Sequence, residues 1–482
     1  MKDPRPPSSP PLPVDDDAAA AFLRAHAGDK TLGPIDFADP LVAASVIVAY
    51  HYMRDVERSL HYWHGEFWRF LGAHYQPHSL ADLREIVYPL GHNAQKPVHK
   101  KHVDDVVDAL RAVTNLADLY EPPCWLLFDN GDPKPSEVIP LANGLLDVAT
   151  RRLLPCTPRF FAMHSVPYQF DPEAPTPDRF LAFLRDLWGD DQESIGLLQE
   201  WFGYCLLPVT ELQKMLLLLG PIRSGKGTII RLLQALLGKV NTASPTLGSL
   251  AQPFGLAPLL GKLLAVISDV RLSGRMDIAT VVENLLRISG EDAVTIPRKY
   301  LPDITTTLST RVMLVSNEVP WFTDGSAAIA SRFLILETTR SFFDQEDVHL
   351  TAALIEELPG VFLWALDGLD RLRERGRFVQ PAGGVEVRDQ MGLLASPVRA
   401  FFDSCVDQGD PAAETVVGDL YAAWKRWSET NGYKHAGSAQ TFGRDLRAAF
   451  PRVRVVQHRV PGGSTVRCYA GVRLRDAQLP NA

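Results

Sequence analysis

The chain of 482 residues has few cysteines, no excess of positive charge and no long apolar run. Its five cysteines lie far apart without a CxxC pair, which disfavours a disulfide framework or a zinc ribbon and suits a reducing compartment. The formal net charge is -8, so any surface that binds nucleic acid must be local. No secretory signal and no membrane-spanning run is apparent, so we expect a cytoplasmic protein without membrane contacts.

What is present predicts about three domains. Hydrophobic residues make up 46% and charged residues 22%, as in globular proteins. Apolar periodicity predicts helices at 40–55, 79–86, 101–115, 177–187, 194–205 and 350–375. LHYWHGEFWRF (residues 60–70) predicts a β-hairpin around His-Gly. We divide the chain into a disordered tail (1–16), an α-rich N-terminal domain of helical and mixed structure (17–205), an α/β core (206–375), a linker containing PAGG (376–395) and a C-terminal module (396–482).

Short apolar runs alternate with helical stretches between Met215 and Phe343. MLLLLG, LLAVISD, RVMLVSN and FLILET are continuous apolar runs that end in small or polar residues. Such runs are typical of central strands that helices cover on both faces. The segment therefore predicts a parallel sheet with crossover helices.

A glycine-rich loop, GPIRSGKGT, follows the first of these runs and precedes a helical stretch. Strand, loop and helix in this order form the context of a phosphate-binding P-loop, in which backbone N–H groups and the helix start face phosphate oxygens. We expect ATP as the ligand, Lys226 on its β- and γ-phosphates, and Thr228 on Mg²⁺. The predicted ATP-binding residues are Gly220, Pro221, Arg223, Ser224, Gly225, Lys226, Gly227 and Thr228. Because Gly227 follows the lysine, and GKGT also occurs in adenylate-kinase-type loops, the loop alone does not separate a motor from a nucleotide kinase.

Three residues at the ends of later apolar runs complete the predicted catalytic set. Asp269 ends LLAVISD, where a carboxylate would hold the Mg²⁺ shell or polarise the attacking water. Asn317 ends RVMLVSN, where an amide could orient water beside the γ-phosphate. Arg332 precedes FLILE, and its planar, permanently charged guanidinium suits a phosphate bound to a neighbouring subunit. The alternatives are that Asp269 caps a turn, Asn317 belongs to an ordinary turn, and Arg332 forms a surface salt bridge.

The segment Ser289–Glu337 resembles superfamily III helicases of the poxvirus, phage and plasmid primase-helicase branch. It shows an acidic turn, a basic pair, a strand ending in asparagine and an arginine-finger motif. These features lie at Glu291-Asp292, Arg298-Lys299, Asn317 and Arg332. Ser331 stands where the branch has a second arginine. Residues 141–184 are similar to the domain that precedes the motor in this family, and the resemblance spans about 60–345.

The resemblance implies a homo-hexameric ring that unwinds DNA with 3′-to-5′ polarity, in a bacterial or phage-infected cell. It also implies a hairpin, by position 295–309, whose Arg298 and Lys299 contact single-stranded DNA; the alternative is a solvated basic loop. Only about 60 residues precede the matching region, too few for the primase domain of many relatives. We therefore expect no primer synthesis, and a separate primase or other replication proteins as partners.

The C-terminal module predicts three helices, at 397–407, 415–430 and 438–450, followed by a β-hairpin around PGGS, which is the winged-helix pattern. Between Lys434 and Arg475 the sequence has nine basic residues and one acid, Asp445. The basic residues are Lys434, Arg444, Arg447, Arg452, Arg454, Arg459, Arg467, Arg473 and Arg475. Arg444 and Arg447 share a helix face, and Arg459 and Arg467 lie on the hairpin, so we expect duplex DNA contacts there. The alternative is a wing that binds protein.

The sequence thus predicts an α/β fold: a P-loop AAA+-like ATPase core with an α-rich N-terminal domain and a C-terminal winged-helix module. The favoured function is an ATP-dependent DNA helicase with ATP and Mg²⁺ as cofactors and single-stranded and duplex DNA as partners. Two alternatives stay open, a P-loop nucleotide kinase and a non-motor DNA-binding ATPase or regulator. Stimulation of the ATPase activity by single-stranded DNA is expected of the helicase and not of either alternative.

Overall fold

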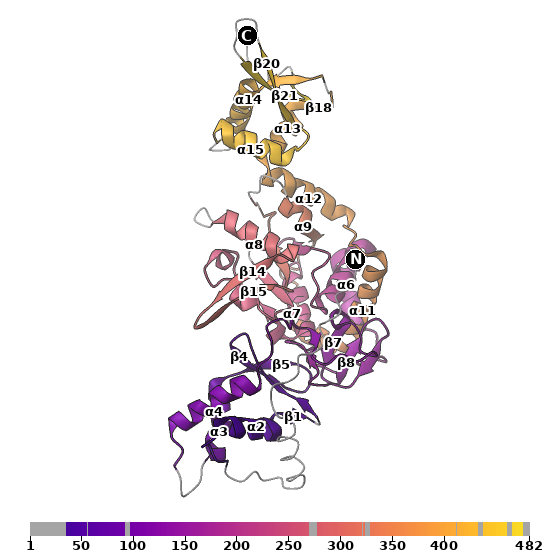
Figure 1. Ribbon diagram of the computed structural model, residues 1–482. Coiled ribbons are helices and arrows are strands. Elements are labelled where there is room, and N and C mark those ends of the chain that lie inside the picture. The colour runs from indigo at the N-terminus through magenta and orange to yellow at the C-terminus, as the bar shows by residue number, and fades with distance from the viewer. Residues whose placement is uncertain are drawn as a thin grey trace. The chain divides into compact units, whose positions relative to one another are not determined.

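The computed structural model describes residues 35–54, 56–91, 97–268, 277–320, 322, 328–410, 412–431, 437–459 and 465–475. The chain has a mixed α/β fold and forms two compact units, whose elements are labelled in Figure 1. The first unit ends at Phe170 and includes Tyr300–Ile304, and the second begins at Asp171 and holds the rest of the chain.

A five-stranded parallel sheet forms the centre of the second unit. Its strand order is β12-β13-β16-β11-β17. The strands are β11 (Met215–Leu219), β12 (Thr242–Ala243), β13 (Leu264–Ser268), β16 (Arg311–Ser316) and β17 (Phe333–Glu337). Every residue of β11 and β16 is buried, as expected of strands covered on both faces. All four apolar runs are therefore strands of one parallel sheet, as predicted.

Helices precede, connect and follow these strands along the chain. The helices are α5 (Asp178–Trp188), α6 (Gln192–Cys205), α7 (Lys226–Leu237), α8 (Ile278–Gly290), α9 (Ala328–Arg332), α10 (Leu350–Glu356), α11 (Leu358–Arg375) and α12 (Ala382–Ala395), and the 3₁₀ turns are η2 (Lys239–Asn241), η3 (Leu247–Ala251) and η4 (Ala257–Leu259). A two-stranded hairpin, β14 (Ala293–Arg298) and β15 (Leu301–Thr307), lies between α8 and β16. The predicted single helix at 350–375 is interrupted at Glu357.

Helices α6 and α11 pack closely, although about 150 residues separate them in the chain. Glu200 of α6 is buried and accepts a bond from Arg371 Nε at 2.8 Å and another from Arg375. A Cβ on Gly203 would lie 2.2 Å from the carbonyl oxygen of Ala365, so glycine permits this approach. Residues 177–205, which we expected in the N-terminal domain, therefore pack with the second unit.

The expected linker at 376–395 is largely helical, which corrects the prediction based on PAGG. Gln380 bonds both to the N–H and to the carbonyl of Ile335, at 2.9 and 2.8 Å, before α12 begins. Pro381 is the N-cap residue, and the two glycines that follow fall in the first turn, where they do not stop the helix. Helix α12 then packs against β17 and α9.

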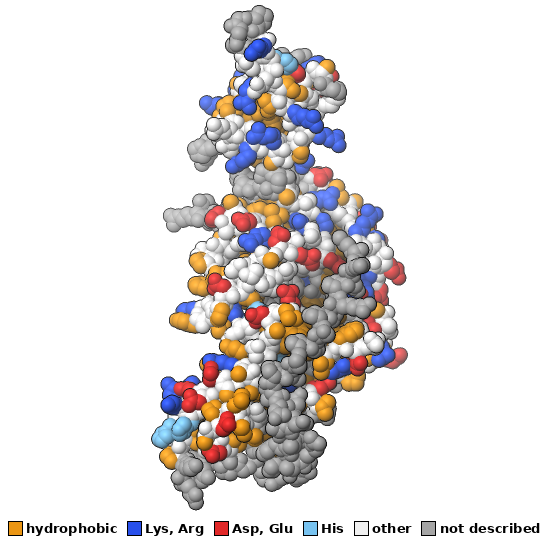
Figure 2. All heavy atoms as spheres, viewed as in Figure 1, with side chains coloured by type: hydrophobic (Ala, Val, Ile, Leu, Met, Phe, Trp, Pro, Cys, Tyr) orange, Lys and Arg blue, Asp and Glu red, His pale blue; other side chains and the backbone are white. Residues whose placement is uncertain are grey.

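The C-terminal module has the predicted three helices and terminal hairpin. Its elements are α13 (Pro397–Cys405), β18 (Val406–Gln408), β19 (Glu414–Val416), α14 (Val417–Thr430), α15 (Ala439–Ala449), β20 (Arg454–Arg459), β21 (Thr465–Ala470) and β22 (Val472–Leu474). Phe401, Trp424, Phe442 and Leu446 are among the buried side chains of its core. The strands pair as β19-β21-β20 and β18-β22. On the face that Figure 2 shows, Lys and Arg side chains are spread over this module.

Over its described residues, the first unit has three helices and short antiparallel sheets. Its elements are α2 (Pro40–His51), β1 (Met53–Arg54), β2 (Glu57–Arg58), β3 (Leu60–Trp63), β4 (Glu66–Phe70), β5 (Tyr75–His78), α3 (Leu80–Gly91), α4 (Lys100–Val113), β6 (Cys124–Trp125), η1 (Pro135–Glu137), β7 (Val138–Leu141), β8 (Gly144–Asp147), β9 (Arg152–Leu154) and β10 (Phe160–Phe161). Residues 124–161 form short strands, so this unit has the mixed structure expected of the N-terminal domain, with fewer helices than the description α-rich implies. The predicted hairpin is present, and its turn residues His64 and Gly65 have φ of 49° and 85°, as a two-residue hairpin turn requires.

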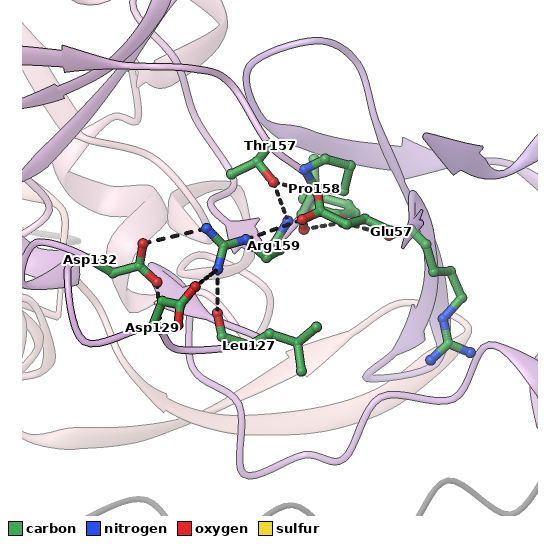
Figure 3. Close-up of polar contacts among 9 residues, drawn as sticks. Glu57, Leu127, Asp129, Asp132, Thr157, Pro158 and Arg159 are labelled. Carbon is green, nitrogen blue, oxygen red and sulfur yellow. Dashed lines mark hydrogen bonds and ion pairs between the residues drawn. The ribbon is translucent and has the colours of Figure 1, made fainter. Parts of the chain in front are cut away.

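A cluster of charged side chains around Arg159 ties the loops of the first unit together (Figure 3). The Arg159 guanidinium lies 3.1 Å from Glu57, 3.5 Å from Asp132 and 3.7 Å from Asp129. It also lies over the Trp125 ring, 5.6 Å from the centroid. Thr157 donates to Glu57, which fixes the carboxylate from the other side. One cation is thus shared by a carboxylate of β2 and two carboxylates of the loop after β6, an arrangement suited to holding these segments together.

Candidate functional site

The carboxyl ends of the parallel strands gather most of the residues predicted to bind ATP. In the register of the sheet, Leu219 pairs with both Ser316 and Glu337, and Val315 pairs with Ser268. The residues that follow these strands, Gly220, Asn317 and Thr338 among them, therefore emerge at one edge. In open parallel sheets this is the edge at which ligands bind.

The loop between β11 and α7 encloses the Lys226 ammonium. Lys226 is buried, and its Nζ donates to the carbonyl oxygens of Gly220 and Pro221, both at 2.6 Å, and to Ser224 Oγ at 3.2 Å. Burial lowers the pKa of Lys226, because the charged form loses hydration. The three oxygens hold the cation inside the curled loop at the start of α7.

The curl of this loop depends on left-handed backbone at two positions. Arg223 and Gly225 have φ of 60° and 82°, and Gly225 is the N-cap of α7. A Cβ at Gly225 would lie 2.8 Å from Leu187 Cδ2, so a side chain there meets both strain and a clash. The glycine-rich segment is therefore a tight turn between a strand and a helix.

A second segment, residues 338–346, lies along the glycine-rich loop. Thr338 Oγ1 donates to Ser224 Oγ at 2.8 Å, and both side chains are buried. Ser341 Oγ donates to the carbonyl of Ile222 at 2.8 Å, and the Phe342 N–H donates to that of Arg223 at the same distance. The polypeptide that follows β17 thus braces the loop along its length.

This segment carries two residues that our sequence reasoning missed. Thr338 follows β17 directly, as Gly220 follows β11, so its place at a strand end was the signal. Arg340 is exposed and lies over the Phe342 ring, 4.6 Å from the centroid. Arg340 follows the end of β17 closely, so its guanidinium lies at the carboxyl ends of the strands, as the glycine-rich loop does.

Of the residues predicted to act on Mg²⁺ and water, two are described. Thr228 lies in the first turn of α7, and its hydroxyl accepts a bond from Arg231 Nη2 at 3.3 Å. Asn317 is exposed at the end of β16. Asp269, which follows the last residue of β13, lies outside the described residues, so its role stays a prediction.

Arg332 lies at the amino-terminal ends of the parallel strands, whereas the glycine-rich loop of the same chain lies at their carboxyl ends. It precedes Phe333, which pairs with Met215 at the start of β11. Its Nη1 donates to the Gln213 side chain, and Lys214 donates to the carbonyl of Ser331 at 2.6 Å. Six residue steps separate the level of Arg332 from that of Gly220, which at about 3.3 Å per residue is about 20 Å.

Lys214, which precedes β11, lies close to Arg332. The pKa of Lys214 is lowered, first by burial and then by the charges of Arg332 and Arg388. Two guanidinium groups therefore act on Lys214 at the amino-terminal ends of the strands.

The two sets of predicted DNA contacts are in different elements. Arg298 ends β14, Lys299 lies in the turn, and Tyr300, which sequence reasoning passed over, is 92% exposed there. Arg444 and Arg447 are exposed on α15, while Arg459 and Arg467 are exposed on β20 and β21. These positions agree with the predicted helix face and hairpin, although no contact with DNA is tested by them.

Within the described residues, every helix is too short or too polar to cross a bilayer. All five cysteines carry free thiols.

Two family models match separate parts of the chain. One, described as D5 N terminal like, matches residues 50–189. The other, a family of unknown function (DUF5906), matches residues 218–332 and so spans most of the parallel sheet. A curated relative, the uncharacterized mitochondrial protein ymf21 of Marchantia polymorpha, is 26% identical over 129 residues, which cover 24% of this chain and 72% of that protein.

Solved structures of the NrS-1 C-terminal region share the fold over most of the chain. The A form apo structure has a TM-score of 0.50 and 14% identity, and the match covers 90% of this chain and 100% of that one. A second apo structure has the same TM-score and identity and covers 90% and 99%. At this identity the likeness concerns the fold.

Proposed function

We propose that this chain is an ATP-driven DNA translocase of a phage-type replication system, a ring-forming helicase with a composite ATP site. The observation that carries the proposal is the buried Lys226 in a glycine-rich loop at the carboxyl edge of a parallel sheet, with Asn317 on the same edge. The match to the D5 N terminal like family and the fold shared with the NrS-1 C-terminal region support the replication context.

ATP would bind with its triphosphate in the curled loop. The Lys226 ammonium, the loop N–H groups and the start of α7 supply positive potential for the phosphates. When bound, Mg²⁺ would neutralise phosphate charge, with Thr228 and Asp269 as its protein partners and Asn317 placed to orient water. Thr338 fixes Ser224, and Arg340 offers a further cation on the same side.

The distance across the sheet supports an arginine supplied by a neighbouring subunit. Arg332 is about 20 Å from the level of its own loop, so it would act only on a nucleotide held by another chain. A guanidinium supplied in trans can raise turnover by about 10³–10⁵-fold. A closed homo-hexamer would repeat this arrangement at every interface.

DNA would be held in two places. The β14–β15 turn presents a basic pair and the exposed Tyr300 ring, a combination suited to phosphates and stacked bases of a single strand. The C-terminal module has the helix and hairpin order of a winged helix, so α15 would enter a major groove while the hairpin arginines contact phosphates.

The first experiment measures ATPase activity of the full chain with and without single-stranded DNA. The wild type hydrolyses ATP faster with DNA, and Lys226→Ala abolishes the activity. Tyr300→Ala keeps the basal rate and loses the stimulation, because it alters the DNA contact and not the ATP loop. An ATPase rate that is the same with and without DNA would favour the regulator or the kinase. Transfer of phosphate to a nucleotide acceptor would favour the kinase.

The second experiment mixes inactive variants and so tests the shared pocket. Arg332→Ala mixed with Lys226→Ala in equal amounts rebuilds roughly a quarter of the pockets if the arginine comes from a neighbour and assembly is random. Arg340→Ala mixed with Lys226→Ala is the matched control, since both changes affect the pocket of one chain and restore nothing. A monomeric particle with ATP and DNA, or no recovery in the first mixture, contradicts the ring.

A further inference from the structure

Three side chains with metal-binding atoms converge on one face of the C-terminal sheet. Glu414 is on β19, Cys468 on β21 and His458 on β20, so each of the three adjacent strands contributes one. In the strand register Glu414 pairs with Ala470 and His458 with Val466, and each partner is two residues from Cys468. Residues two apart on a strand share a face, so all three side chains project from the same side.

The ligand atoms of these residues are close enough to surround one cation. A carboxylate oxygen of Glu414, a ring nitrogen of His458 and the Cys468 sulfur all lie within 4.8 Å of one another. His458 Nε2 is 2.7 Å from Glu414 Oε2. An ion pair explains those two side chains, but it gives no reason for the thiol of a third strand to face the same point.

The electrostatics of the cluster favour a bound cation over a bare thiol. Burial, followed by the charges of Glu414 and Asp419, raises the pKa of Cys468. Two carboxylates therefore act on the sulfur, and Asp419 lies in the first turn of α14. A divalent cation reverses this relation, since it is attracted by the same carboxylates and deprotonates a coordinating thiol.

We propose that Glu414, His458 and Cys468 form a binding site for zinc or a zinc-like divalent cation. Sulfur, imidazole nitrogen and carboxylate oxygen are the three ligand types that Zn²⁺ takes in proteins, usually in tetrahedral geometry. The fourth position falls to water. Glu414 and His458 are exposed, so the ion reaches the site from solvent, while Cys468 forms its buried floor.

The ion would clamp β19, β20 and β21, and with them the hairpin that carries the exposed arginines. It would therefore set how rigidly the hairpin is held. Loading requires neutral His458 and deprotonated Cys468, so it releases protons and strengthens as the pH rises. This proposal is independent of the ATP site.

The test uses the full chain, stripped with a chelator and dialysed against Zn²⁺ without nucleotide. The wild type is expected to retain one more equivalent of zinc than Cys468→Ser and His458→Gln. Co²⁺ in place of Zn²⁺ gives a thiolate-to-cobalt absorption band in the wild type that Cys468→Ser removes. Cys156→Ser, which removes a half-buried thiol in the first unit, is the matched control and keeps both signals.

Equal zinc content in the wild type and both variants overturns the proposal, as does a cobalt band that survives Cys468→Ser. Circular dichroism checks the fold of each variant. If Cys468→Ser unfolds, the His458→Gln comparison still decides, because that side chain is exposed and its loss leaves the core of the module intact. ATPase activity of the same samples is a separate measurement, so failure of the metal site is distinguishable from failure of the motor.

Discussion

Acidification should destabilise the first unit through His61. This histidine is buried, with its ring centroid 5.4 Å from that of Tyr75 and 6.2 Å from that of Phe161. Burial, followed by the charge of Arg58, lowers the pKa of His61 to about 3. An unfolded histidine has a pKa of about 6.5, so below that pH the unfolded chain binds more protons than the folded one.

The sign and size of the effect follow from this difference. The folded pKa lies below the unfolded value, so stability is complete above about pH 6.5 and falls as the pH decreases toward 3. At pH 5 the penalty is about 2 kcal/mol, since each unit of pH costs at most about 1.4 kcal/mol. The pKa values of His51, His74 and His78 are lowered by burial too, so they act in the same direction.

Urea unfolding at pH 7 and pH 5, followed by tryptophan fluorescence, measures the effect. Trp63 and Trp68, two of the nine tryptophans, lie in the aromatic cluster beside Phe161, so part of the signal reports on this region. His61→Phe keeps an aromatic ring there and should lose about 2 kcal/mol less than the wild type between the two pH values. His102→Gln changes an exposed ring and should behave as the wild type. An equal loss in His61→Phe and the wild type would refute the reasoning.

Three further outcomes are expected. Gly225→Ala abolishes ATP binding in calorimetry because its φ is 82° and the added methyl meets a buried leucine, whereas Gly227→Ala meets only the end of an arginine and keeps binding. Glu200→Gln removes the carboxylate that two arginines share and lowers the free energy of unfolding by about 1–3 kcal/mol, measured by thermal denaturation. Arg447→Ala weakens duplex DNA binding for all sequences and reduces the salt-dependence slope by about 1 in fluorescence anisotropy titrations; an unchanged slope would place phosphate contacts elsewhere.

The parts of the fold that sequence predicted are those determined locally. Continuous apolar runs with polar ends gave four strands of the sheet, and His-Gly gave a hairpin turn. The glycine-rich loop was recognisable because its backbone conformation is determined by consecutive residues. By contrast, β12 has two residues, too few for any periodicity, and joins the sheet only through its pairing with β13.

The errors concern contacts between distant segments. By sequence alone, Gln380 and the glycines after it suggest a flexible connection. In the structure, the Gln380 side chain accepts a hydrogen bond from the Ile335 N–H and donates one to the Ile335 carbonyl. The partnership of Ser224 with Thr338 likewise joins residues more than a hundred positions apart. Nothing in either local sequence specifies such a pairing, because it arises from the order of strands in the sheet.

The close packing of α6 and α11 limits where the polypeptide can be cut. One helix precedes the first strand of the sheet and the other follows the last, and the buried Glu200 with its two arginines fastens them. A fragment that stops near residue 345 would remove α11 from its contact with α6 and leave the buried Glu200 carboxylate without its two arginines. Expression fragments of the sheet should therefore retain both helices and also α12, which packs against β17, and so should run from residue 171 through 395.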